Sequence, residues 1–361
     1  MKFSTTIYDR DFGSGLATPV GLTLTVQRYS FAVPGGPDAA TITARGPEAA
    51  IAELIQRLRC PIEIYDEAGA LMWWGFINQV TASLNGFEFG ASLDSMSNRV
   101  AVAYSFVTPG SADVGTRKTT AWADDADSVD EYGYKDLLSS LDGATDAQAI
   151  LARDLILAQY KYPVATWQSA AMADGTAQIV CSGWWSALDW RMYANSGTDS
   201  IATTTQIDEA ITAAGQFFPD TSIETASGID SSEYQDGDST LRTVVEALLA
   251  GGTSAGARLT ALVTKDRLAR ILAEPAAGAS DYQWLRDGSL YDSVGARVDA
   301  RECPAGMWLT RPDIGSINLG QLISPLQTFV TRAEFDAATG IYRPEVRGVP
   351  GPFEIAEWVR R

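Results

Sequence analysis

The chain has 361 residues, of which 46% are apolar and 20% are charged, a composition typical of a packed globular protein with two or three domains. Its 27 Lys and Arg residues against 45 Asp and Glu residues give a net charge of −18, which argues against proteins that wrap nucleic acid or bind anionic membrane surfaces. The sequence contains no histidine, which excludes Ser-His-Asp and Cys-His catalysis, histidine acid–base chemistry and histidine-ligated metals.

The three cysteines, Cys60, Cys181 and Cys303, lie far apart in the sequence and form no C-x-x-C motif. We therefore expect three reduced, unpaired thiols and neither a zinc ribbon nor a redox dithiol. The first eleven residues lack the apolar core of a signal peptide, and no apolar run reaches 18 residues. These observations predict a protein made in a cytoplasm, without a cofactor, a metal site or a membrane-spanning segment.

Residues 1–106 are predicted to form a β-rich domain with one helix. Five segments show the strand character of this region, namely residues 22–27, 62–65, 71–80, 87–93 and 100–106. The Pro-Gly-Gly-Pro run at 34–37 predicts a turn. Pro47 begins a stretch with apolar residues at helical spacing, which predicts a helix over 47–58.

Residues 107–162 are predicted to be an acidic linker followed by a helical insert. Thr145 and Gln148 form a capping box, which predicts a helix over 145–160. The apolar residues of this helix share one face and are Ala147, Ile150, Leu151, Leu155 and Ala158.

Residues 163–275 are predicted to contain further strands and two helices, which begin near Thr205 and Ser239. A hairpin is expected over 257–273, around Lys265 and Asp266. The final segment, 276–361, is predicted to consist of short strands without a long helix.

One pattern occurs twice along the chain, because a helix leads into a hairpin at 47–78 and again at 239–272. A second similarity relates residues 96–100 to residues 188–192, because each follows a strand that carries a small residue and a serine, Ala91-Ser92 and Cys181-Ser182. If these similarities reflect duplication, the chain carries two related β-barrels, the second of them split by insertions. On this interpretation the first 106 residues form one barrel with a flanking helix. Residues 163–275 supply the second barrel and an insert, and residues 276–361 complete the second barrel or form a small β domain. The alternative is that helix–hairpin units recur without duplication.

Carboxylates are the remaining candidates for acid–base chemistry. They form two clusters in the sequence, one with Asp124, Asp125, Asp127, Asp130 and Glu131 and the other with Glu224, Asp230, Glu233, Asp236 and Asp238. A glycosidase needs two carboxyls at a fixed separation in an aromatic-lined cleft. Solvated surface is the more ordinary interpretation in so acidic a chain. Residues 236–239 lack the pattern of a calcium loop, and the glycine-rich run 251–256 lacks the Lys-Ser or Lys-Thr of a phosphate loop. We therefore expect no catalytic centre.

Two tryptophan pairs, Trp73-Trp74 and Trp184-Trp185, lie in or beside predicted strands. Consecutive strand residues face opposite sides, so one tryptophan of each pair should enter the core and the other should face outward. An outward tryptophan often marks an interface, and we regard these four residues as candidates for protein–protein contact. The core of a second domain and a sugar-stacking platform are the alternatives.

Three segments resemble the baseplate or tail-tip hub proteins of long-tailed bacteriophages, whether siphovirus-like or myovirus-like. They are residues 24–77, with Pro34-Gly35-Gly36-Pro37 and Trp74-Gly75-Phe76-Ile77, residues 128–160, which begin with Ser-Val-Asp-Glu-Tyr-Gly, and residues 183–193. Such hubs are trimers in which each subunit carries two tail-tube-like barrels, so that three chains adapt a six-fold tube to a three-fold tip. The resemblance implies an α+β fold that is mainly β with α insertions: two tail-tube-like antiparallel β-barrels and smaller inserted domains.

The sequence and the resemblance together predict a structural, non-enzymatic protein of the virion tail tip. The implied partners are further copies of the chain as a trimer, a tail tube or distal tail protein, a tape-measure protein and a tip or fibre protein. DNA would pass through without specific binding, and the chain would not insert into a membrane. The alternatives are an acidic glycan-binding or glycan-cleaving protein and another tail structural protein, such as a distal tail ring or a fibre adaptor.

Two acidic stretches suggest how DNA could pass such a ring. Residues 121–150 carry eight Asp or Glu residues against one Lys, and residues 219–241 carry six against none. An anionic channel wall would repel the DNA phosphates, whereas a cationic wall would hold them. The sequence thus predicts a net negative channel lining, and a solvated outer surface is the alternative.

Overall fold

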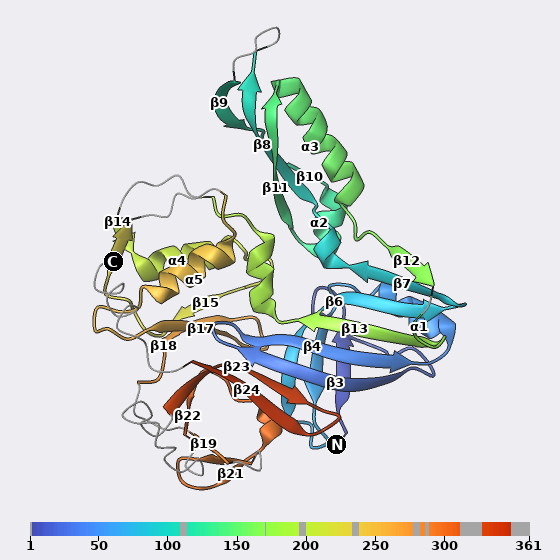
Figure 1. Cartoon of the computed structure of the whole chain (residues 1–361), viewed down its shortest axis with the longest axis vertical. Helices are drawn as coiled ribbons and strands as arrows, with labels where there is room; N and C mark the ends of the chain where they lie inside the picture. Colours follow the sequence, from blue (N-terminus) through green and yellow to red (C-terminus); the bar gives the residue numbers. More distant parts are fainter. Residues whose placement is uncertain are drawn as a thin grey trace, which may run out of the picture.

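A computed structural model describes residues 2–108, 114–169, 171–194, 200–232, 238–276, 282–285, 289–310 and 327–347. These residues form 24 strands, five α-helices and three 3-10 helices, so the prediction of a mainly β protein with helices is confirmed (Figure 1). The elements gather into a large central sheet, an arm that projects from it and a smaller unit that contains two of the helices.

The central sheet is mixed and contains 15 strands. Nine come from the first half of the chain: β1 (Ser4–Tyr8), β2 (Gly15–Leu16), β3 (Thr23–Ala32), β4 (Gly36–Arg45), β5 (Pro61–Tyr65), β6 (Leu71–Leu84), β7 (Phe87–Ser92), β12 (Thr166–Ser169) and β13 (Thr176–Ser182). Six come from the end of the described chain: β19 (Tyr282–Trp284), β20 (Leu290–Asp292), β21 (Arg297–Val298), β22 (Trp308–Thr310), β23 (Gln327–Asp336) and β24 (Ile341–Arg347).

The core of the molecule begins on one face of this sheet, where neighbouring strands align their apolar side chains. A buried row crosses strands β3, β4, β13 and β6 through Val26, Ile42, Ile179 and Val80. The adjacent row points to the opposite face and is polar, with Thr25, Thr43, Gln178 and Thr81. This alternation fixes the register, because a shift of one residue would expose the apolar row. Helix α1 (Glu48–Ile55) lies against β6 and buries Ile51 and Leu54.

The arm consists of residues 99–160 and projects away from the central sheet (Figure 1). Its elements are β8 (Arg99–Val107), β9 (Val114–Thr119), β10 (Ala123–Asp124), α2 (Ala126–Tyr132), β11 (Asp136–Ala144) and α3 (Asp146–Tyr160). The capping box predicted for α3 is present, with the Thr145 hydroxyl and the Gln148 side chain both bonded. Strand β11 was not predicted, because we expected only a linker and helices before α3; it pairs in parallel with β8.

The smaller unit lies beside the central sheet and combines two helices with short strands. Its elements are η2 (Trp184–Trp190), β14 (Ser200–Ala202), α4 (Thr203–Thr212), β15 (Thr221–Ile223), β16 (Asp230–Ser232), α5 (Leu241–Ala250), β17 (Leu259–Val263) and β18 (Ala269–Ala273). The helices expected near Thr205 and Ser239 and the hairpin expected over 257–273 are therefore confirmed. Two further 3-10 helices are η1 (Leu93–Ser95) and η3 (Ala300–Glu302).

The expectation of two β-barrels is not met in the part of the chain that the structure describes, where the strands form an open path and no closed barrel. Strand β13, which we assigned to a second barrel, lies between β4 and β6 of the first segment. The reason is its alternation: Ala177, Ile179 and Cys181 all face the core that β4 and β6 already build. Strand β23 likewise pairs with β3, so the end of the chain extends the first sheet.

The two local similarities nevertheless correspond to similar elements. Helices α1 and α5 each lead into a hairpin, formed by β5 and β6 in one case and by β17 and β18 in the other. Strands β7 and β13 each end in serine and lead into the 3-10 helices η1 and η2. These units have similar local order but occupy different places in the fold.

Candidate functional site

The segment 183–193, which includes η2, is the junction of the molecule. Its first residues contact the central sheet: the Gly183 N–H donates to the Asp38 carbonyl oxygen at 2.6 Å, and the rings of Trp184 and Phe76 pack with centroids 5.0 Å apart. Trp190 packs edge-on against Phe76 as well. The 3-10 helix is thereby fixed to strands β4 and β6.

The same segment contacts the smaller unit along α5. The Trp185 indole N–H donates to Glu246 Oε1 at 3.1 Å, and Asp189 forms an ion pair with Arg242 at 3.0 Å. The Leu241 N–H donates to the Arg191 carbonyl oxygen at 2.9 Å. These bonds hold the first and second turns of α5 to the junction.

Asp136, at the start of β11, ties the arm to the junction. Its carboxylate pairs with Arg191 at 3.2 Å and with Arg99 at 3.4 Å, and it accepts the Met192 N–H at 3.0 Å. The carboxylate is only 1% exposed. The aromatic ring of Tyr134 lies under both guanidinium groups. The junction thus connects all three parts of the fold through a few neighbouring residues.

The four predicted interface tryptophans lie inside this arrangement. Trp73, Trp184 and Trp185 are at most 3% exposed, and Trp74 is half-buried. The Trp74 indole donates to the Val263 carbonyl oxygen at 3.2 Å, because the β17 hairpin covers the face of β6 that we expected to be open. Trp184 and Trp185 belong to a 3-10 helix, so the two-residue alternation of a strand does not apply to them.

The predicted carboxylate clusters do not converge within the described residues. In the first cluster, Asp125 caps α2 and bonds Lys161, which lowers the pKa of Asp125, while Glu131 pairs with Arg10 at 3.0 Å. In the second, Arg270 bonds Glu224 and lowers the pKa of that carboxyl. Asp238 pairs with Arg117 of the arm at 2.9 Å. Glu233 and Asp236 lie outside the described residues.

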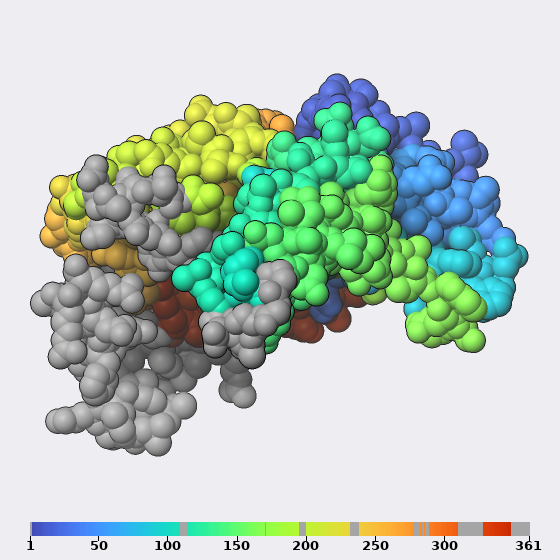
Figure 2. Space-filling view, turned by 90° about the horizontal axis from the view of Figure 1, so that it is seen from above, coloured from blue at the N-terminus to red at the C-terminus, as the bar shows by residue number. Residues whose placement is uncertain are grey.

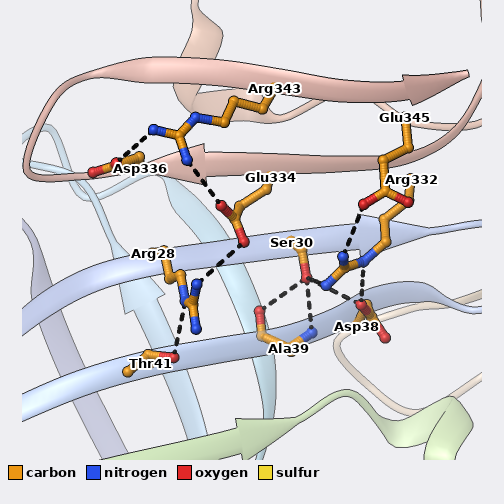
Figure 3. Close-up of polar contacts among 10 residues, drawn as sticks. All are labelled: Arg28, Ser30, Asp38, Ala39, Thr41, Arg332, Glu334, Asp336, Arg343 and Glu345. Atoms are coloured by element: carbon orange, nitrogen blue, oxygen red, sulfur yellow. Dashed lines mark hydrogen bonds and ion pairs between the residues drawn. The ribbon is translucent and has the colours of Figure 1, made fainter.

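A charged network crosses strands β4, β3, β23 and β24 on the polar face of the sheet (Figure 3). Arg332 is its centre and bonds Asp38 at 2.8 Å, Glu345 at 3.1 Å and the Ser30 hydroxyl at 3.3 Å. Arg343 pairs with Asp336 at 3.2 Å, and the Thr339 N–H donates to Asp336 and lowers its pKa.

The network borders a hollow of about 390 Å³, whose polar lining includes Arg28, Ser30, Thr41, Gln178, Arg332 and Glu334. Glu334 lies between Arg28 and Arg343, at 3.8 Å from each. Each carboxylate drawn in Figure 3 therefore contacts a guanidinium group. Because its strands come from both ends of the chain, we infer that the ion pairs of the network stabilise the packing of β23 and β24 against β3 and β4.

The structure describes no three His, Cys, Asp or Glu side chains grouped closely enough to hold a metal ion. Among the helices it describes, none has the length and apolar character needed to cross a membrane.

All three cysteines are buried and unpaired, as predicted. Burial raises the pKa of each thiol, that of Cys303 to about 12. We therefore expect the folded chain to react negligibly with dithionitrobenzoate at neutral pH, because the thiolate is the reacting species. The same chain in denaturant without reductant should show three thiols. A smaller number in denaturant would reveal a disulfide, and rapid reaction of the folded chain would contradict the burial.

Sequence reasoning missed the most exposed aromatic side chain among the described residues, Trp167. It is 71% exposed on the short strand β12 and stacks edge-on with Phe87, with ring centroids 5.7 Å apart. A signal was available, because Trp167 stands in the polar run Thr-Trp-Gln-Ser, and the i±2 positions that share its face hold only the small residues Ala165 and Ser169.

No protein-family model matches the chain, and no curated protein matches it. Several solved structures show distant likeness, and three of them, each with 8% sequence identity, are tail proteins. A tail protein from Neisseria meningitidis has a TM-score of 0.45, with 96% of each chain covered. The 43 kDa tail protein of prophage MuSo2 from Shewanella oneidensis has a TM-score of 0.41, with 91% of this chain and 96% of that chain covered. Prophage tail protein gp18 from Listeria monocytogenes has a TM-score of 0.38, with 99% of each chain covered.

Proposed function

We propose that the chain is a structural protein of a bacteriophage tail, placed at the tail tip or baseplate as a hub. The observation that carries the proposal is the junction. Residues 183–193, one of the three segments that resemble hub proteins, are the segment that fixes the arm and the smaller unit to the central sheet. The charged and aromatic residues of the junction serve this scaffold, which is what a protein with an assembly role requires.

The proposed mechanism is assembly through surfaces that the scaffold presents. The central sheet ends in short strands, and among the described strands β12 pairs only with β7 and β24 only with β23. Such edges carry unpaired backbone groups that can pair with another chain. We propose that copies of the chain form a three-fold ring that contacts a tail tube or distal tail protein, a tape-measure protein and a tip or fibre protein. Adaptation of a six-fold tube to a three-fold tip follows from the family resemblance.

The acidic stretch 121–150 lies in the arm, over α2, β11 and the start of α3. In the proposed ring these carboxylates would contribute to a channel wall that repels DNA phosphates. DNA would then pass without specific binding.

Immunogold electron microscopy of phage particles tests this proposal. We expect an antibody against the purified chain to label the tail tip. Disruption of the gene should yield particles that lack a functional tail tip. Label along the whole tail shaft would instead indicate another tail structural protein. Particles without label would overturn the proposal, and turnover of a polysaccharide by the purified chain would favour the glycan-cleaving alternative.

A further inference from the structure

The exposed apolar side chains of this protein are concentrated in one stretch. Thirteen large apolar side chains are exposed among the described residues, and seven of them lie between residues 150 and 167. An eighth, Phe87, stacks on Trp167. We call these eight side chains the apolar ribbon: Phe87, Ile150, Leu151, Leu155, Tyr160, Tyr162, Val164 and Trp167. Scattered exposed apolar residues are ordinary, but so local a concentration marks a contact surface.

Helix α3 supplies the first half of the ribbon because it has two apolar faces. Ala149 and Ile156 point inward and pack with Val102 and Tyr104 of β8. The face that we predicted from the sequence is the other one, and it points outward: Ile150, Leu151 and Leu155 are 44, 59 and 61% exposed. A helix that packs on one side of a small sheet needs one apolar face. The second face is free for another contact.

Strand β12 and the residues before it supply the second half. All four residues of β12 are exposed, and Trp167 is the most prominent. Among the described strands, β12 pairs only with β7, so its outer edge offers backbone donors and acceptors to a further strand. Figure 2 shows α3 and the corner formed by β12 and β7 on one view of the molecule.

The charge of this stretch differs from that of the chain. Residues 147–169 contain the cations Arg153 and Lys161 and the anion Asp154, against a net charge of −18 for the whole chain. Arg153 pairs with Asp154, and Lys161 pairs with Asp125. Two copies of an acidic protein repel each other through their negative charges. A nearly neutral apolar surface reduces this repulsion where the copies meet.

The size of the ribbon also fits an interface between subunits. At roughly 200 Å² for a large side chain, eight side chains exposed by 37 to 71% offer ~800 Å², which is what one partner contributes to a standard interface. We propose that the apolar ribbon is a subunit interface and that its occupant is a second copy of this chain. The inference rests on the proposed assembly role and adds to it the surface through which copies meet.

Analytical ultracentrifugation of the purified full chain tests the inference. We expect the wild-type chain to associate at concentrations up to about 100 µM, a range in which an interface of micromolar Kd is populated. The double variant Leu151→Asp, Leu155→Asp should raise the Kd at least tenfold. A matched control is Val20→Asp, Val294→Asp, because these residues are 94 and 85% exposed and lie outside the ribbon. Circular dichroism should show that both double variants remain folded.

A second variant tests the β12 end of the ribbon. Trp167→Ala removes a side chain that contacts the fold through Phe87, so the variant should fold and yet associate more weakly. A monomeric wild-type chain, or equal association of the ribbon and control variants, would overturn the inference. Label at the tail tip together with a monomeric chain would leave the proposed function standing and refute the ribbon alone. If the chain associates through the ribbon but is absent from phage particles, the ribbon would stand and the proposed function would be refuted.

Discussion

Replacing Asp136 by alanine is expected to lower the free energy of unfolding by about 3 kcal/mol, because it leaves two guanidinium groups without their shared carboxylate. Arg99 and Arg191 are only 25 and 17% exposed, so water replaces the lost partner poorly. The Met192 N–H loses its acceptor as well. Since these groups belong to the arm and to the junction, the arm should loosen first. Urea denaturation measures the loss, and proteolysis should show new cleavage between residues 99 and 160.

Asp142→Ala is the matched control, because Asp142 lies on the same strand and is exposed. It should change the free energy of unfolding by less than about 0.5 kcal/mol, as surface substitutions usually do. Equal effects of the two variants would show that Asp136 contributes no more than an ordinary surface carboxylate. Retained stability in Asp136→Ala would refute the role of this residue in fixing the arm.

Local elements were predictable from the sequence because their signals lie within a few residues. Pro47 and the spacing of Ile51 and Leu54 predict α1, and the capping box of Thr145 and Gln148 predicts the start of α3. In each case propensity, capping and apolar periodicity agree. The partner of a strand is a different matter, since alternation defines a face and not a neighbour. Strand β13 was therefore correctly expected as a strand and assigned to the wrong sheet.

The candidate site was harder to predict because exposure depends on packing between distant segments. Trp74 lies next to the buried Trp73 and therefore on the other side of β6, as the alternation requires, but residue 263 covers it from 189 positions further along the chain. Conversely, Leu151 and Leu155 have the periodicity of a buried helix face and point to solvent, because α3 packs with Ala149 and Ile156. The sequence pattern shows that a face is apolar, and the tertiary structure decides what covers it.

Gly183→Ala is expected to be the most destabilising single-methyl substitution at the junction. A Cβ atom there would lie 1.7 Å from the Pro37 carbonyl oxygen and 2.5 Å from its carbon, distances that no side-chain rotation relieves. The backbone would have to move apart, and the hydrogen bond from the Gly183 N–H to Asp38 would break. Overpacking in a core typically costs 1–3 kcal/mol, so we expect a loss of at least about 3 kcal/mol at this backbone contact.

Gly15→Ala provides the comparison, because a Cβ atom at Gly15 would meet only the Thr6 methyl group at an ordinary 3.7 Å. The free energy of unfolding of that variant should lie within about 0.5 kcal/mol of the wild-type value, since nothing in the fold has to shift. Thermal and urea unfolding of both variants measure the difference. If Gly183→Ala proves as stable as Gly15→Ala, Gly183 does not contact the Pro37 backbone of β4 as closely as described. The junction would then not hold the central sheet and α5 together in this way. If it unfolds early and the tryptophan fluorescence shifts to the red, buried indole rings, which include those of Trp184 and Trp185, have become exposed to water.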